Sequence, residues 1–135
     1  MNPLRILVAD DHKDFRKVVS DYLNRLPNIV VVGEASDGVD VIDKMELLDP
    51  DVVLMDITMP RRNGLEATRI IKHRWPLKKV VIATMHESEL YRAEAKEANA
   101  DGFIVKSSLR TGLQETFGRG VFSPVTSVSS LSTGK

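Results

Sequence analysis

The side chains in this sequence that could do chemistry stand directly after short apolar segments. They are two aspartates after the first segment, one after the third, a threonine after the fourth and a lysine after the fifth: Asp10, Asp11, Asp56, Thr84 and Lys106. Carboxylates act as nucleophiles and as hard oxygen ligands, a hydroxyl donates a hydrogen bond, and an ammonium group neutralises anions. Gathered in one place, such a set could hold a divalent ion and act on a phosphoryl group.

The apolar segments that precede these side chains have the composition of buried β-strands. They are rich in β-branched residues and apolar nearly throughout, as strands covered on both faces of a sheet are. The pattern therefore predicts five strands, over Leu4–Ala9, Ile29–Val32, Val52–Met55, Val80–Ala83 and Phe103–Val105.

The stretches between the predicted strands have the spacing of amphipathic helices. In the first, apolar residues recur at intervals of three and four from Phe15 through Val18 to Leu26, and Pro27 ends the helix. Three more helices are expected at 39–48, 65–75 and, with a weaker stripe that begins at Leu90, 90–98. A fifth is expected at 109–117, where an interior glycine, Gly112, lowers helix stability by about 1 kcal/mol.

Five alternations of strand and helix predict an α/β fold, a doubly wound (βα)5 parallel sheet with right-handed crossovers. Five-stranded sheets of this kind commonly have the flavodoxin-like order 2-1-3-4-5, in which strands one and three are neighbours. Ligands bind beyond the carboxyl ends of such strands. We therefore expect the three aspartates to meet there, with Thr84 on one side and Lys106 on the other.

Three carboxylates in one pocket repel one another. At about 5 Å and an effective dielectric constant of about 20, each pair costs roughly 3 kcal/mol. Such a cluster either holds a proton or recruits a cation, and oxygen ligands without sulfur or imidazole favour Mg²⁺. Together with a carboxylate nucleophile, a lysine and a hydroxyl, Mg²⁺ completes the set of groups that phosphoryl transfer requires.

Each of these residues also has an ordinary structural explanation. The aspartates after the first strand could cap a helix that begins near His12, since aspartate is a preferred N-cap residue. Asp56 could merely precede a turn, Thr84 could merely end a strand, and Lys106 could be a solvated charge. Their joint occurrence at four strand ends, on the side that this topology makes common, favours a site.

Composition excludes several classes of protein. The chain has 135 residues, 19 basic and 19 acidic side chains and no cysteine, so we expect one domain without disulfides or a thiolate zinc site. Zero net charge argues against a surface built for nucleic acid. No apolar run resembles a membrane span or a signal peptide, which predicts a cytoplasmic protein. We place the domain at residues 1–122 and interpret 123–135, rich in serine, as a polar linker or tail.

The motifs around these residues resemble those of the receiver domain of bacterial two-component response regulators, which has a CheY-like fold. They cover residues 4 to about 120 in the family's order: Val8–His12, Leu54–Pro60, Asn63–Gly64, Ala83–Thr84 and Ala100–Lys106. The phrases ADDH and MDITMPRRNGLEAT look most like the NarL/LuxR-type subgroup. In that subgroup a helix-turn-helix DNA-binding domain follows the receiver.

The resemblance implies that Asp56 accepts a phosphoryl group from a sensor histidine kinase. Asp11 and Asp56 would bind Mg²⁺ with the backbone carbonyl of Thr58, and Asp10 would bind it directly or through water. Lys106 would contact the phosphoryl group.

The resemblance also assigns the conformational response. Thr84 would swing toward the phosphoryl group and Phe103 would follow as the switch aromatic, although Phe103 could instead be a plain core residue. Pro60 and Gly64 would shape the loop after the phosphoacceptor. Thr58, together with His86, would tune loss of the phosphoryl group.

The resemblance thus implies a phosphorylation-driven switch rather than an enzyme, with only self-phosphorylation and autodephosphorylation as activities. Its output would be transcription, with DNA bound only through a C-terminal domain that this chain lacks. No membrane partner is implied, and a homodimer stays open. A degenerate receiver that only binds partners is the alternative. A haloacid-dehalogenase-like phosphatase would normally carry a second aspartate where Thr58 stands.

Two departures from the family pattern concern the fifth strand. Serine follows Lys106 where many receivers have a proline, often after a cis peptide bond, and a cis bond before a non-proline residue costs about 3–4 kcal/mol. The peptide geometry at that position stays open. Phe103 lacks the hydroxyl of the tyrosine that is often found there.

Overall fold

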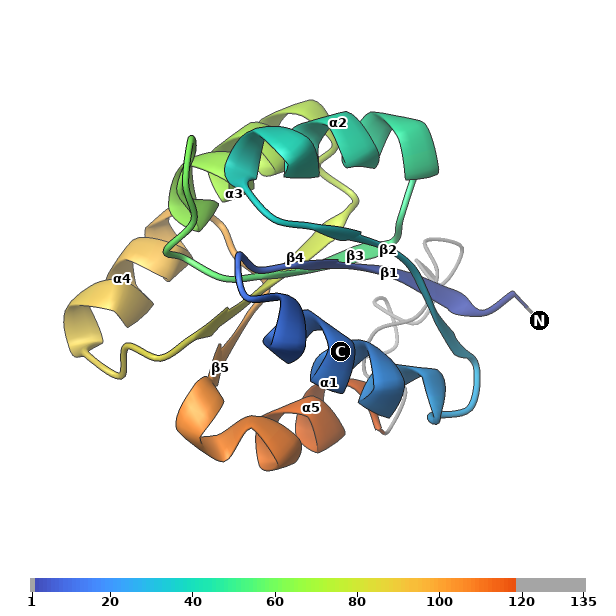
Figure 1. The fold of residues 1–135 in the computed structure, drawn as a ribbon. Helices are drawn as coiled ribbons and strands as arrows, with labels where there is room; N and C mark the ends of the chain where they lie inside the picture. The colour runs from blue at the N-terminus through green and yellow to red at the C-terminus, as the bar shows by residue number, and fades with distance from the viewer. Residues whose placement is uncertain (1, 119–135) are drawn as a thin grey trace, which may run out of the picture.

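The computed structural model describes residues 2–118 and shows a parallel five-stranded sheet in the order β2-β1-β3-β4-β5 (Figure 1). This is the predicted fold and strand order. The predicted segment 123–135 lies outside the described residues. The elements are β1 (Leu4–Ala9), α1 (Lys13–Asn24), β2 (Ile29–Ala35), α2 (Gly38–Leu48), β3 (Val52–Met55), α3 (Gly64–Arg74), β4 (Lys79–Thr84), α4 (Glu89–Glu97), β5 (Gly102–Val105), a 3₁₀ turn (Lys106–Ser108) and α5 (Leu109–Phe117).

Helices cover both faces of the sheet. On one face α2, α3 and α4 enclose an apolar cluster, and on the other α1 and α5 enclose a second one (Figure 1). The central strands β1, β3 and β4 are buried almost completely. Burial on both faces explains why these strands read as continuous apolar runs rather than as alternating patterns. No helix within residues 2–118 is long and apolar enough to cross a membrane.

Two of the large apolar residues in the helical stripes are exposed rather than buried in the core. Val18 in α1 has 59% of its surface accessible and Leu90 in α4 has 66%. The buried face of α1 consists of Val19, Ser20 and Leu23, so the predicted stripe was wider than the face that meets the sheet. A helix buries only a limited arc against a flat sheet, and the periodicity does not reveal which edge of a wide stripe is excluded.

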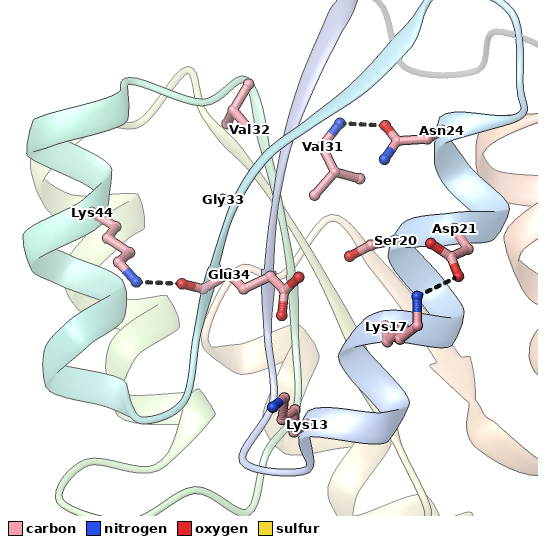
Figure 2. A pocket seen from close by; sticks show the side chains of 10 residues that line it. All are labelled: Lys13, Lys17, Ser20, Asp21, Asn24, Val31, Val32, Gly33, Glu34 and Lys44. Atoms are coloured by element: carbon pink, nitrogen blue, oxygen red, sulfur yellow. Dashed lines mark hydrogen bonds and ion pairs between the residues drawn. The ribbon is translucent and has the colours of Figure 1, made fainter.

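Strand β2 is longer than predicted and forms one edge of the sheet. It continues through Gly33 and Glu34, residue types that are depleted in strands, and its register with β1 shifts between Ile6 and Leu7. Figure 2 shows how neighbouring helices cover this edge: Asn24 Oδ1 accepts the N–H of Val31 at 3.0 Å, and the ammonium of Lys44 donates to the carbonyl of Glu34. Such cover protects an edge strand from pairing with another chain.

The glycine in α5 has a packing role that outweighs its low helix propensity. A Cβ at Gly112 would lie 2.6 Å from Ile104 Cγ2, a side-chain atom of β5. Glycine therefore allows the helix to lie close against the last strand, next to Lys106.

Candidate functional site

The carboxyl ends of β1 and β3 bring the predicted aspartates together. The two strands are neighbours, and the N–H of Asp56 donates to the carbonyl of Ala9 at 2.9 Å, just beyond the end of the paired strands. Asp10 donates its own N–H to the carbonyl of Ala35 in β2, at 3.0 Å. Backbone bonds therefore hold the two aspartates at the edge of the sheet where their strands end.

The interpretation of the first two aspartates as helix caps is wrong. Helix α1 begins at Lys13 after His12, and no side chain caps it. Asp10 turns back instead, and its Oδ1 accepts the N–H of His12 at 2.8 Å. This bond frees the other carboxylate oxygen of Asp10 for a different partner.

That partner is the ammonium group of Lys106. Its Nζ lies 2.5 Å from Asp10 Oδ2 and 3.7 Å from Asp56 Oδ1, while the three side chains are 8%, 1% and 8% exposed. The Nζ also lies 4.0 Å from the centre of the Phe15 ring, within range of a cation–π contact. One buried ammonium group thus forms ion pairs with two buried carboxylates.

The pKa of Asp56 is raised to about 6 in this environment. Loss of solvation by burial is the largest cause, and the negative charge of Asp10 adds to it. Lys106 acts in the opposite direction, and Asp11 contributes a further small increase. The lysine therefore offsets only part of the cost of an ionised Asp56, which leaves a site where a further cation would be stabilised.

The loop after Asp56 is held close by a glycine. The N–H of Gly64 donates to the carbonyl of Ile57 at 2.7 Å, and a Cβ at Gly64 would lie 1.9 Å from the carbonyl oxygen of Asp56. Any side chain would therefore push the first turn of α3 away from the aspartate. Asn63 and Glu66 close a capping box at the same helix start, which fixes where the loop ends.

The far side of this loop is tied to α2. The guanidinium of Arg61 pairs with both carboxylate oxygens of Asp37, the N-cap residue of α2, at 2.9–3.0 Å. Burial raises the pKa of Asp37, but the hydrogen bonds from the Asp40 N–H and from Arg61 outweigh burial and lower it. Pro60 is exposed within the loop, and its carbonyl accepts the N–H of Arg62 at 2.7 Å.

The opposite wall is formed by the end of β4. Thr84 is completely buried, and its Oγ1 accepts the N–H of His86 at 3.1 Å. The imidazole of His86 stacks on the ring of Tyr91 with a centroid distance of 4.6 Å, which fixes it beside α4.

These walls enclose a cavity of about 210 Å³ lined by Asp11, His12, Asp56, Thr58, Thr84, Met85, His86 and Lys106. Six of the residues singled out in the sequence are therefore brought together: Asp11, Asp56, Thr58, Thr84, His86 and Lys106. Asp10 is not among the lining residues, but it pairs with the ammonium of Lys106, which is. Pro60 and Gly64 belong to the adjoining loop rather than to the lining.

Phe103 does not line the cavity either. Its ring is half-buried against the core on the side of α4, and the guanidinium of Arg92 lies 4.5 Å from its centre. The peptide bond that joins Lys106 to Ser107 is trans.

Three residues of the site were not singled out in the sequence: Met85, which lines the cavity, Phe15 and His12. Phe15, which lies against the ammonium of Lys106, gave no separate signal because its apolar stripe had assigned it to the core. His12 directs Nδ1 at Asp10 Oδ1 (3.2 Å) and at Asp11 Oδ1 (3.0 Å). His12 stands beside the aspartate pair in the Val8–His12 motif, which was the available signal, but no role of its own in the site was assigned to it from the sequence.

Comparisons with known proteins agree with this geometry. Residues 6–117 match the response regulator receiver domain family. The chain is 38% identical over 105 residues to the transcriptional regulatory protein DegU of Brevibacillus brevis, covering 78% of this chain and 44% of DegU. It is 40% identical over 106 residues to a protein-glutamate methylesterase/protein-glutamine glutaminase of Pyrococcus abyssi, covering 78% of this chain and 29% of that protein.

Among solved structures, a LuxR-family two-component response regulator from Aurantimonas sp. SI85-9A1 superimposes with a TM-score of 0.82 at 33% identity, covering 87% of this chain and 84% of that one. The chain thus spans less than half the length of the two curated relatives named above. The family match over residues 6–117 includes all the residues that line the cavity.

Proposed function

The chain belongs to the response regulator receiver domain family and is of the NarL/LuxR type, and from this premise we propose that Asp56 accepts a phosphoryl group from a sensor histidine kinase. One observation carries the proposal: the Lys106 ammonium lies between two buried carboxylates, Asp10 and Asp56, at the edge of an open cavity. A group placed there contacts a nucleophile and a cation at once.

The transfer step follows from the positions of the side chains. A carboxylate oxygen of Asp56 forms a bond to phosphorus, and the bond between phosphorus and the imidazole nitrogen of the donor breaks. The imidazole leaves with the electron pair and takes a proton from solvent. Lys106 neutralises charge on the phosphoryl oxygens, and because its Nζ already lies 3.7 Å from Asp56 Oδ1 it needs little rearrangement.

The donors at the cavity fit Mg²⁺. Asp11, Asp56 and Thr58 line it; the two carboxylates and the backbone carbonyl of Thr58 would bind the ion, and Asp10 would take part directly or through water. The raised pKa of Asp56 also supports the proposal, because a bound cation would offset the loss of solvation and the repulsion that disfavour its ionised form. When bound, Mg²⁺ would neutralise phosphoryl oxygens and favour ionised Asp56.

The switch would follow from a change in partners. Thr84 now accepts a hydrogen bond from the backbone of its own loop, and after phosphorylation its hydroxyl would donate to a phosphoryl oxygen instead. Phe103 sits half-buried beneath Arg92, from where it would move inward as the loop between β4 and α4 shifts. Two pre-existing states are then repopulated by one added group.

The test is incubation of the full chain with a small phosphoryl donor, with and without Mg²⁺, followed by intact-mass measurement. We expect one phosphoryl adduct that requires Mg²⁺ and is absent in Asp56→Ala. Asp51→Ala, which changes the aspartate just before β3, is the matched control and should keep the adduct if it folds. A wild type without an adduct would instead support the alternative, a degenerate receiver that only binds partners.

His86 is expected to slow hydrolysis of the phosphoryl group. Its imidazole lines the cavity and is held in place by Tyr91, so its bulk obstructs the approach of water to the acyl phosphate. His86→Ala should shorten the phosphoryl lifetime roughly three- to tenfold, which corresponds to about 0.7–1.4 kcal/mol in barrier height. The lifetime is followed by intact mass after removal of the donor. His73→Ala is the control, because His73 lies in the last turn of α3, at the end away from Asp56. An equal phosphoryl lifetime in wild type and in His86→Ala would refute the prediction.

The output of the switch is proposed from the likeness to transcription regulators. DegU is a transcriptional regulatory protein, and the chain corresponds to less than half of its length. We propose that residues 1–122 are the receiver of a cytoplasmic transcription regulator, without enzymatic turnover of its own, and that 123–135 leads toward a DNA-binding domain. The likeness to a methylesterase shows that this domain also occurs in enzymes.

A further inference from the structure

Another pocket lies between helix α1 and the edge strand β2 (Figure 2). Its walls come from one face of α1, from residues 31–34 of β2 and from Lys44 of α2. Its volume is about 660 Å³, within the range of about 300–1,000 Å³ that is usual for sites of small molecules. It shares no lining residue with the cavity at Asp56, and the phosphotransfer proposed above gives it no role.

A buried hydroxyl points into this pocket without a partner. Ser20 is only 7% exposed, and Figure 2 shows its oxygen directed from α1 toward the strands. Within residues 2–118 its Oγ is the one buried side-chain nitrogen or oxygen atom that has no hydrogen-bond partner. It does not even donate to the carbonyl one turn earlier, as a serine inside a helix often does. Because buried polar groups are nearly always hydrogen-bonded, this hydroxyl is placed for a partner from outside the chain.

The charges around the pocket favour an anion. Its two carboxylates are already paired, Glu34 with Arg16 at 2.8 Å and Asp21 with Lys17 at 3.2 Å. The ammonium of Lys13 forms no ion pair with any of the residues that the structure describes. Because Lys13 and Lys17 lie one turn apart on α1, their like charges repel, and one anion between them would stabilise both. A phosphate monoester suits this place, since it carries about −1.5 to −2 charges at neutral pH.

The distance between the lysines and the hydroxyl determines the shape of the ligand. Lys13 and Ser20 are seven residues apart, which corresponds to two turns, or about 10 Å, along α1. An inorganic phosphate ion is too small to meet both, whereas a nucleoside monophosphate is long enough. Val31 and Val32 form an apolar wall along this path, against which a ring can pack.

We propose that the pocket between α1 and β2 binds an elongated phosphate monoester of the size of a nucleoside monophosphate. Its phosphate group lies between the ammonium groups of Lys13 and Lys17, and a polar group of its body forms a hydrogen bond with the hydroxyl of Ser20. The proposal does not depend on phosphotransfer to Asp56, because the two sites have no residue in common.

The experiment is a nuclear magnetic resonance titration of the full chain with adenosine 5′-monophosphate and, separately, with adenosine and with inorganic phosphate. We expect the nucleotide to shift the backbone amide signals of Ser20 and Gly33 to saturation and to leave the amide of Thr84 in place. Adenosine and phosphate should each bind at least about tenfold more weakly, because neither spans both ends of the pocket. The proposal is overturned if the nucleotide shifts neither Ser20 nor Gly33, if it shifts Thr84 instead, or if either half binds as tightly as the whole.

Variants test the hydroxyl and the charge separately. Ser20→Ala should weaken nucleotide binding about three- to tenfold and leave the melting temperature equal or higher, because it removes an unpartnered hydroxyl and favours the helix. Thr111→Ala, which removes an exposed hydroxyl from α5, is its control and should keep the wild-type affinity.

Lys13→Gln should weaken binding of the nucleotide and of inorganic phosphate by a similar factor, about three- to tenfold, and should leave adenosine binding unchanged. Lys96→Gln, at an exposed lysine of α4, is the matched control. A Ser20→Ala variant that binds the nucleotide as tightly as wild type would overturn the proposal, as would equal affinities of Lys13→Gln and Lys96→Gln.

Discussion

Asp56→Asn is expected to raise the free energy of unfolding by about 3 kcal/mol at pH 7.5, in the absence of divalent ions, while it abolishes the phosphoryl adduct. Burial and the charge of Asp10 raise the pKa of Asp56 to about 6, from 3.8 in the unfolded chain. A shift of about two pH units corresponds to roughly 3 kcal/mol of differential free energy. Asparagine keeps the shape of the side chain and removes the charge that the fold disfavours.

The pH dependence of this gain has a definite sign. The folded state keeps the proton on Asp56 to higher pH than the unfolded state does. Between about pH 4 and pH 6 the folded state therefore binds more protons, and the free energy of unfolding of the wild type falls as the pH rises through this range. Above it the loss is complete. The stability gained by Asp56→Asn should therefore be about half as large at pH 5 as at pH 7.5.

Urea unfolding of both proteins at the two pH values, with a chelator present, measures this difference. Asp43→Asn neutralises an exposed carboxylate on α2 and is the matched control, expected to change stability by less than about 0.5 kcal/mol. A variant that is equally stable or less stable than wild type at pH 7.5 would contradict the electrostatic account of Asp56.

Such a gain would mean that the site is maintained at the expense of stability. The receiver keeps three carboxylates and one lysine where a neutral cluster would be more stable, because a nucleophile beside a cation-binding pocket requires them. The backbone contacts of Gly64 and the salt bridge of Arg61 hold the loop in place around this arrangement. The surrounding fold thus holds Asp56 in an unfavourable electrostatic environment.

The fold and the position of the site were predictable because both depend on the repeated spacing of apolar residues along the chain. Buried parallel strands read as continuous apolar runs, and their carboxyl ends all lie on one edge, so the residues after them were expected to meet. The structure has the predicted order and brings Asp56, Thr84 and Lys106 to one cavity. The fold class and the edge that carries the site therefore follow from periodicity and connectivity, while the strand order was expected because five-stranded sheets of this kind commonly have it.

The features that the sequence could not predict depend on contacts between residues that lie far apart along the chain or on the orientation of single side chains. The sequence indicates only that Gly112 weakens α5. The structure gives the reason for a glycine at this position, because a Cβ there would lie 2.6 Å from Ile104 Cγ2. Val18 fitted the apolar stripe of α1 yet lies outside the arc that meets the sheet. The orientation of the His12 ring toward two carboxylates is set by three-dimensional geometry for which the sequence holds no periodic signal.

Lys106→Met is expected to lower the free energy of unfolding by about 3 kcal/mol at pH 7.5 without divalent ions. Methionine retains most of the apolar stem but removes the ammonium that lies 2.5 Å from Asp10 and 3.7 Å from Asp56. Removing one partner of a buried ion pair costs about 3–5 kcal/mol, because the remaining charge is left without compensation. Uptake of a proton by the carboxylates limits the loss to the lower end of that range.

The double variant Asp10→Asn/Lys106→Met separates charge from packing. If the loss in Lys106→Met comes from an unpaired buried carboxylate, neutralising Asp10 should restore most of the stability, and Asp10→Asn alone should cost less than the lysine variant because Lys106 keeps Asp56 as a partner. Urea unfolding of wild type, both single variants and the double variant completes the cycle. A double variant as unstable as Lys106→Met would show that the ammonium stabilises this edge of the sheet through its contact with the Phe15 ring, and not through its pairing with Asp10.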